Sequence, residues 1–104
     1  MKRIKRRYLA FQLECETLPS ERDFMDSVWA AVTKLYGEVG ASTTALTLIN
    51  FDGERKIFVI RCLLASLPMV RASLATITSV AGKEAAGHVL AVSGTLKALY
   101  TSIG

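Results

Sequence analysis

The sequence predicts an α+β domain in which two helices pack on one face of a four-stranded antiparallel sheet. Three observations lead to this fold class. Residues 8–15 alternate between two sets of side chains, as a half-buried strand does. Two later segments repeat apolar residues at helical spacing. Between them, two β-rich runs are separated by Asp52-Gly53, a strong hairpin signal.

The first strand and the first helix follow directly from this spacing. One face of the strand carries Leu9, Phe11, Leu13 and Cys15. Ser20 and Asp23 resemble a helix-starting capping pair, and Gly37 stands where a left-handed helix cap is favoured. The helix is therefore expected over residues 20–36. Its two apolar rows are Phe24, Val28, Ala31 and Leu35, and then Met25, Trp29, Val32 and Tyr36.

The middle of the chain is expected to form a hairpin. A loop over residues 37–44 leads into a strand over residues 45–51, and the return strand covers residues 56–64. Both faces of the return strand are apolar except at Arg61, which predicts a central position in the sheet. Its outer side is either covered by a partner or partly exposed. That side carries Ile57, Val59, Arg61 and Leu63.

The last third of the chain completes the pattern. Pro68 suits the first turn of a second helix, which we expect to continue until Gly82. Residues 88–93 form the last strand. The order strand, helix, strand, strand, helix, strand is that of the ferredoxin-like βαββαβ sandwich. The structure after Gly94 stays open.

Several features of the chain concern partners and location. At 104 residues it forms one domain, residues 8–104, preceded by a basic arm over residues 1–7. The apolar fraction of 51% is high for so small a domain and predicts contact with a partner. On the first helix, Trp29 and Tyr36 belong either to the core or to such a protein interface, where amphipathic aromatic side chains are enriched.

Neither a membrane span nor a signal peptide is expected. No uncharged stretch approaches the ~20 residues that cross a bilayer, and the basic N-terminus lacks an apolar segment. We therefore expect a cytoplasmic protein without a membrane partner. The two cysteines, Cys15 and Cys62, have no disulfide-framework or metal-ligand spacing and are expected to be reduced and buried.

The basic residues are concentrated at the N-terminus. Of the thirteen, five lie within the first seven positions, so eight remain against nine acidic residues in the rest of the chain. A cationic arm on a nearly neutral domain favours a phosphate backbone, since its charges release condensed counterions. Solvation of the terminus and attraction to anionic lipid are the other readings. The five are Lys2, Arg3, Lys5, Arg6 and Arg7.

No self-sufficient catalytic site is recognisable. The single histidine, His88, has no nucleophile or carboxylate near it in sequence, and no phosphate-binding loop or dinucleotide motif occurs. Acylphosphatase shares the size and fold, but its glycine-rich loop after the first strand is replaced here by residues 16–19. The aromatic signature of the RNA-recognition motif is missing from residues 56–64, which leaves Tyr8 as thin evidence for base stacking.

Three further features carry two readings each. Arg61 either pairs with Glu14 across neighbouring strands or projects from the open sheet face as a phosphate ligand. Arg71, in the first turn of the second helix, either points into water or awaits an anion. The turn Ser93-Gly94-Thr95, followed by Lys97, is either a simple bend or a phosphate-binding turn.

Four segments together resemble the protein component 2 family of archaeal ribonuclease P, which has a eukaryotic counterpart. The resemblance covers nearly the whole chain in the right order. Its most specific pieces are the Ile60-Arg61-Cys62 strand and the Ser93-Gly94-Thr95 ending. The segments are residues 7–11, 57–62, 70–74 and 92–97.

The resemblance implies a ferredoxin-like subunit that binds the catalytic RNA of the ribonucleoprotein removing 5′ leaders from precursor tRNA. Bond cleavage would belong to Mg²⁺ ions on the RNA, with no cofactor bound by this chain. Protein component 3 and a second copy in a heterotetramer are the implied protein partners, with precursor tRNA an indirect one. The expected protein interface is Trp29, Tyr36, Ile57, Val59 and Leu63. The expected RNA-facing surface is Lys2, Arg3, Lys5, Arg6, Arg7, Arg61, Arg71, Ser93, Gly94, Thr95 and Lys97.

Two other functions compete with this expectation. A protein-interaction or small-molecule-binding regulatory module on the same sandwich would bind RNA only weakly. A small phosphatase-like enzyme would turn over substrate as the isolated chain. Neither would stimulate a catalytic RNA.

Overall fold

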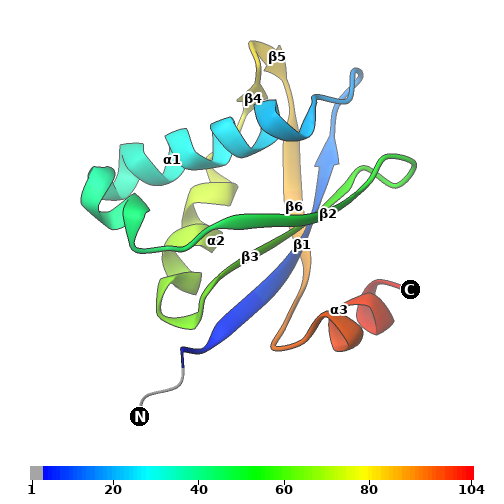
Figure 1. The fold of residues 1–104 in the computed structure, drawn as a ribbon. Helices are drawn as coiled ribbons and strands as arrows, with labels where there is room; N and C mark the ends of the chain where they lie inside the picture. The colour runs from blue at the N-terminus through cyan, green and yellow to red at the C-terminus, as the bar shows by residue number, and fades with distance from the viewer. Residues whose placement is uncertain (1–3) are drawn as a thin grey trace.

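The computed structural model describes residues 4–104 and has the predicted four-stranded sheet with two helices on one face (Figure 1). The sheet order is β2-β3-β1-β6, and every neighbouring pair is antiparallel, as in a ferredoxin-like sandwich. The elements are β1 (Arg6–Glu14), α1 (Glu21–Ser42), β2 (Thr47–Asp52), β3 (Ile57–Leu63), a 3-10 turn (Leu64–Ser66), α2 (Leu67–Ala75), β4 (Ser79–Val80), β5 (Lys83–Glu84), β6 (Ala86–Ser93) and α3 (Leu96–Ile103).

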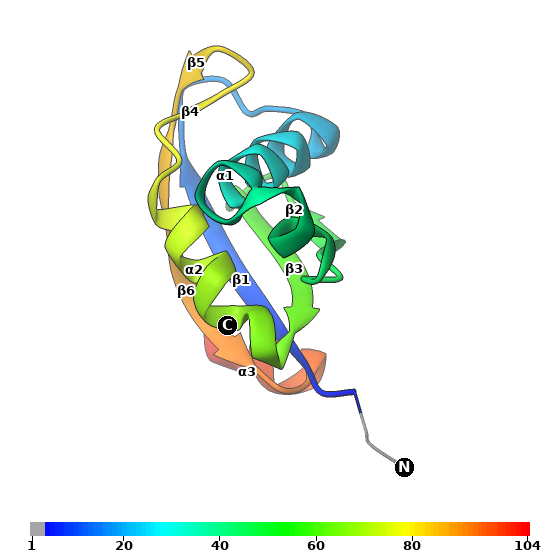
Figure 2. The ribbon, with the colours of Figure 1, turned by 90° about the vertical axis from the view of Figure 1, so that its left-hand side faces the viewer.

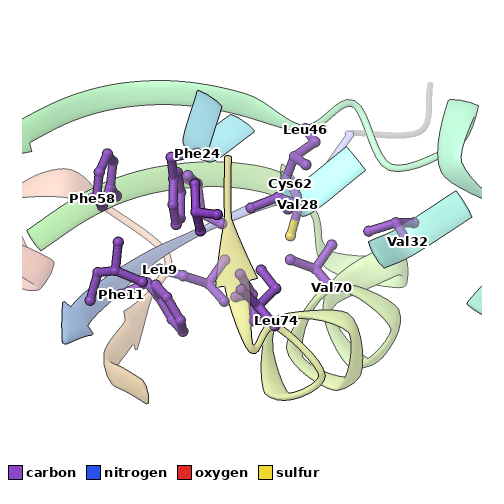
Figure 3. Close-up of a cluster of buried hydrophobic side chains, with 14 of the residues drawn as sticks. Leu9, Phe11, Phe24, Val28, Val32, Leu46, Phe58, Cys62, Val70 and Leu74 are labelled. Atoms are coloured by element: carbon purple, nitrogen blue, oxygen red, sulfur yellow. The ribbon is translucent and has the colours of Figure 1, made fainter. Parts of the chain in front are cut away.

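The main core lies between the sheet and the layer formed by α1 and α2. Figure 2 looks onto this helical layer, and Figure 3 shows the side chains beneath it. Three phenylalanine rings join the layers, because Phe24 of α1 stacks on Phe58 of β3, which also stacks on Phe51 of β2. The predicted alternation of β1 is confirmed, since Leu9 and Phe11 are buried in this core.

Helix α1 is longer than the sequence predicts. Its N-cap is Ser20, whose hydroxyl accepts a hydrogen bond from the Asp23 backbone N–H, as expected. Gly37 interrupts it with φ 77° and ψ 172°, a conformation outside the helical range that glycine adopts readily. The predicted loop over residues 37–44 is wrong, because the chain resumes a helical course after this kink and continues to Ser42.

The buried row of α1 also differs from the prediction. Val32 is fully buried and continues the line of Phe24 and Val28, whereas Leu35 is 47% exposed. The buried residues stand four apart, so the buried stripe of α1 follows the i, i+4 row, which runs closer to the helix axis than the i, i+3 row.

Helix α2 ends at Ala75, and the predicted extension to Gly82 is wrong. The chain instead forms a short hairpin of β4 and β5, whose central residues Ala81 and Gly82 both have positive φ. Four β-branched residues explain the early end, because such side chains favour strands over helices; they are Thr76, Ile77, Thr78 and Val80. Val80 is buried and extends the core under this hairpin.

A third helix, which the sequence left open, covers part of the opposite face of the sheet. Leu99 of α3 is fully buried against Ala10, Ile57 and Val59 in a second apolar cluster. Two hydrogen bonds fasten α3 to the β2–β3 hairpin: Asn50 Nδ2 donates to the Tyr100 hydroxyl at 3.2 Å, and Arg55 Nη2 donates to the Ile103 carbonyl. The outer side of β3 is thus largely covered by the chain itself.

Both outermost strands of the sheet contain one residue more than their partners. In β2, Ile49 is the additional residue, because Leu48 pairs with Ile60 and Asn50 pairs with Val59. In β6, Leu90 is the additional residue opposite β1. Such bulges bend a strand and interrupt its hydrogen-bonding edge.

Candidate nucleic-acid interface

The fold gathers most of the predicted RNA-binding cations at one end of the sheet. Strand β1 begins there, while β3 and β6 end there (Figure 1). Arg6 pairs with Leu63, and the Lys5 carbonyl accepts a hydrogen bond from Leu64 N–H at 2.9 Å. Lys5 and Arg6 are exposed. Two residues predicted for the arm, Arg6 and Arg7, therefore belong to the first strand, and Lys2 and Arg3 lie outside the described residues.

Strand alternation sends neighbouring arginines to opposite faces. Arg6 shares the outer face, on which α3 lies, with Arg61. Arg7 stands opposite the buried Cys62 and so belongs to the face of α1 and α2. A Cβ on Gly94 would lie 3.5 Å from Arg7 Nη1, which places this guanidinium beside the turn after β6.

Arg61 does not form the ion pair proposed as its structural role. It is paired in register with Tyr8, whereas Glu14 lies at the far end of β1 opposite Ala86. Among residues 4–104 the one ion pair within 4.0 Å joins Arg22 and Asp26 on exposed α1. Arg61 is half-buried. Its Nε atom is buried, and among residues 4–104 no acceptor forms a hydrogen bond with it. Its charge is therefore not neutralised by any described carboxylate.

The turn after β6 is organised by its own hydroxyl groups. Thr95 Oγ1 caps α3 by accepting from the Ala98 backbone N–H at 3.2 Å, and Ser93 Oγ accepts from Thr95 N–H at 3.4 Å. Both oxygens therefore already accept hydrogen bonds within the chain. Lys97 is exposed in the first turn of α3.

Arg71 lies on α2, in the helical layer, and not on the strands of the sheet. It is exposed and is the fifth residue of α2, because the helix begins at Leu67 and not at Pro68. It thus lies beyond the first turn, where the sequence placed it. The expected RNA-facing surface is in this way divided between the sheet end and α2.

The residues expected at a protein interface are separated by the fold. Ile57 and Val59 are only 2% and 3% exposed, because α3 covers them, so they are not available as surface here. Leu63 is half-buried, and Trp29 packs partly against the main core. Tyr36 remains 41% exposed.

Tyr36 is one of three exposed apolar side chains around the Gly37 kink, which the sequence did not reveal. Its neighbours Leu35 and Val39 are 47% and 81% exposed, on either side of the Gly37 kink. We call these three residues the kink patch. Leu35 also lines an open groove of about 460 Å³ between α1 and the segment after α2. The patch was missed because Leu35 was assigned to the core and Val39 to a loop.

Acidic side chains gather at the opposite end of the sheet. An open hollow of about 800 Å³ lies there, and its charged lining consists of Glu14, Glu16, Glu84 and one cation, Lys83. The chain thus has a basic end and an acidic end, a polarity that composition alone does not show. It arises because antiparallel register brings distant charges together.

Neither His88 nor Cys62 stands in a cluster of metal-ligating side chains within the described part of the chain. His88 is exposed on β6 opposite Gln12, and residues 4–104 hold no group of three or more His, Cys, Asp or Glu side chains placed to bind a metal ion. Burial raises the pKa of the Cys62 thiol to about 11. Within the same residues, no helix is long and apolar enough to cross a membrane.

Comparisons with known proteins give a matching family model and similar proteins that bear the same name as one another. The model of the Rpp14/Pop5 family matches residues 7–103. Ribonuclease P protein component 2 of Methanosarcina mazei is 39% identical over 95 residues, covering 91% of this chain and 80% of that protein. The component 2 of Pyrococcus furiosus is 33% identical over 97 residues, covering 93% and 81%.

One solved structure has the same fold. A chain in the cryo-EM structure of yeast ribonuclease MRP superposes with a TM-score of 0.74 at 15% identity, covering 92% of this chain and 79% of that one. At this identity the similarity concerns the fold.

Proposed function

The chain belongs to the Rpp14/Pop5 family, and on that premise we propose that it is a non-catalytic protein subunit of ribonuclease P. In this role it binds the catalytic RNA and supports removal of the 5′ leader from precursor tRNA. The proposal assigns the bond-breaking step, and the Mg²⁺ ions that serve it, to the RNA subunit. This chain would contribute binding surface and no cofactor.

The observation that carries the RNA-binding part is the uncompensated charge at the sheet end. Arg6 and Arg61 lie on one face there, and neither has an acidic partner among residues 4–104. Cations held without a carboxylate retain their full attraction for phosphate. The acidic hollow at the other end gives the molecule a preferred orientation toward a polyanion, with its basic end leading.

The protein partners of the proposed subunit are protein component 3 and a second copy of this chain. The kink patch supports this part, because its apolar side chains are exposed in the free chain. The expectation that Ile57 and Val59 take part is withdrawn, since α3 buries them.

Reconstitution tests the proposal. The full chain is combined with ribonuclease P RNA, with and without component 3, and cleavage of precursor tRNA is measured under limiting Mg²⁺. We expect cleavage to require the RNA and to rise when the chain is added, and we expect Arg61→Gln to reduce that rise while the variant remains folded. Cleavage by the chain without RNA, or RNA cleavage indifferent to the chain, would refute the proposed role.

A further inference from the structure

Four side chains form one row across the entire sheet at its basic end. Thr47 of β2 pairs with Arg61 of β3, Arg61 pairs with Tyr8 of β1, and Tyr8 pairs with Ser93 of β6. Residues paired directly across antiparallel strands point to the same face of a sheet. The four residues, which we call the cross-sheet row, therefore share one face.

That face is the outer one, and the row begins where α3 stops covering it. The preceding outer positions, Ala10 and Val59, are buried under α3, whereas Tyr8 packs against the same cluster only partly. Arg61 and Ser93 are likewise half-buried, and Thr47 is exposed. The row thus packs on one side against the second apolar cluster beneath α3, and its other side is open to solvent.

The chemistry of the row suits one class of ligand. A tyrosine ring offers a flat face on which a nucleobase stacks, and this mode is tolerant of base identity. Beside it, the Arg61 charge has no carboxylate partner among residues 4–104, and its Nε lacks an acceptor there. The Ser93 hydroxyl accepts from Thr95 N–H and keeps its own proton to donate to a phosphate oxygen or to a ribose 2′-hydroxyl, whereas Thr47 Oγ1 already donates to the Ala45 carbonyl at 3.2 Å.

We propose that the cross-sheet row binds one unpaired nucleotide of RNA, with the base stacked on Tyr8 and its phosphate held by Arg61. This inference rests on the proposed RNA-binding function and specifies how part of that surface works. Directly paired residues have Cβ atoms roughly 5 Å apart, so a single nucleotide reaches both side chains. A base within a duplex is already stacked on both sides and offers no free face to Tyr8.

The first test uses variants of the full chain and two labelled probes: a single-stranded RNA of about 12 nucleotides, within the usual site size for such surfaces, and a duplex of the same sequence. We expect Tyr8→Leu to weaken single-strand binding by about 5- to 150-fold while leaving duplex binding unchanged. Tyr8→Phe keeps the ring and should bind like wild type. An equal effect of Tyr8→Leu on both probes, or none on either, would overturn the proposal.

Arg61 is tested by the salt dependence of the same single-strand binding. Loss of one phosphate contact should lower the log–log slope by about 0.7 in Arg61→Gln. The matched control is Arg22→Gln, since Arg22 is an exposed arginine on α1, far from the row in the fold. A slope that stays the same in Arg61→Gln, or falls equally in both variants, counts against the assignment.

A measurement on the wild-type chain tests the proposal even if the variants do not fold. Single-stranded RNA containing 4-thiouridine is crosslinked to the chain by light and the protein is digested with trypsin. Cleavage after Arg7 releases a peptide that begins at Tyr8 and ends at Arg22, which we expect to carry the nucleotide. Crosslinks confined to other peptides would refute the row as the stacking site.

The outcomes separate this inference from the proposed function. If the wild-type chain stimulates the catalytic RNA and Tyr8→Leu does so equally, with no single-strand defect, the row is wrong and the subunit role stands. If the wild-type chain neither binds nor stimulates the RNA, the subunit role itself fails and the row fails with it.

Discussion

Phe24 of α1 lies nearly parallel to Phe58 of β3, with ring centroids 3.8 Å apart and ring planes inclined by 13° (Figure 3). Both side chains are fully buried. This stack joins the helical layer to a central strand, because Phe58 also meets Phe51 on the edge strand β2. The position of α1 over the sheet therefore depends on a few aromatic contacts.

Removing one ring of this stack should strongly destabilise the fold. We expect Phe24→Ala to lower the free energy of unfolding by about 3–5 kcal/mol, because the lost burial is accompanied by a cavity. Urea denaturation followed by circular dichroism measures the change. Val39→Ala on the same helix is the control, since Val39 is exposed and its loss should cost no more than about 0.5 kcal/mol. Similar costs for the two variants would contradict this account of the core.

Gly87 is required by the close approach of β6 to β1. A Cβ at this position would clash with the Gln12 carbonyl oxygen and stand 2.6 Å from Phe11 Cζ. We therefore expect Gly87→Ala to destabilise the chain by about 1–3 kcal/mol through overpacking. Gly53→Ala is the control, because the nearest atom to its added Cβ lies at an ordinary 3.7 Å. Thermal unfolding of the two variants in parallel gives the comparison.

The thiol of Cys62 should be protected and should make stability depend on alkaline pH. Burial raises its pKa from 9.0 to about 11, so the folded state favours the neutral thiol. An unfolded chain ionises earlier, which means that this contribution to stability is complete below about pH 9 and is lost as the pH rises to about 11. Unfolding free energies measured across this range should fall less in Cys62→Ala. An identical decline would exclude Cys62 as the cause.

The basic residues before the first strand should supply a distinct share of RNA affinity. Replacing Lys2, Arg3 and Lys5 together by glutamine leaves β1 intact, since that strand begins at Arg6. If each cation contacts a phosphate, the log–log salt slope of RNA binding should fall by about 2. Fluorescence anisotropy at several salt concentrations measures the slope. A slope equal to that of wild type would remove these three residues from the interface.

The kink patch should govern protein association and leave RNA binding unchanged. We expect Val39→Glu to weaken self-association and binding to component 3, because a charge at the centre of an apolar interface must be desolvated. Analytical ultracentrifugation with and without component 3 reports the complex. RNA affinity, measured in parallel, serves as the internal control. Undiminished association in Val39→Glu would show that the partners bind elsewhere.

The regular helices and strands were predictable because they depend on the local periodicity of apolar residues. The alternation in β1 and β3 assigned Phe11 and Phe58 to the core correctly, and Ser20 marked the start of α1. The errors arose where tertiary packing overrides local pattern. The helical segment after Gly37 and the hairpin centred on Ala81 and Gly82 both occur at a glycine that the local pattern predicts only as a helix end.

The candidate site was predictable only in its residue types. Arg61 was identified because it interrupts an apolar strand, but its neighbours depend on strand register, which the sequence does not specify at this precision. Of the two interpretations of Arg61, the ion pair with Glu14 was therefore wrong, and Tyr8 was undervalued. Helix α3 decides which outer residues are covered, and its short segment after Gly94 has no unambiguous local signature. The burial of Ile57 and Val59 could not be inferred without it.

The additional residues Ile49 and Leu90 affect the tendency of the free chain to aggregate. Unpaired outer strands are common starting points for fibril growth, because a second molecule can extend the ladder indefinitely. Here each such strand is distorted by its bulge, so stacking of copies edge to edge is discouraged on both sides. The two bulges thereby lower the risk of fibril formation in a protein with so large an apolar fraction.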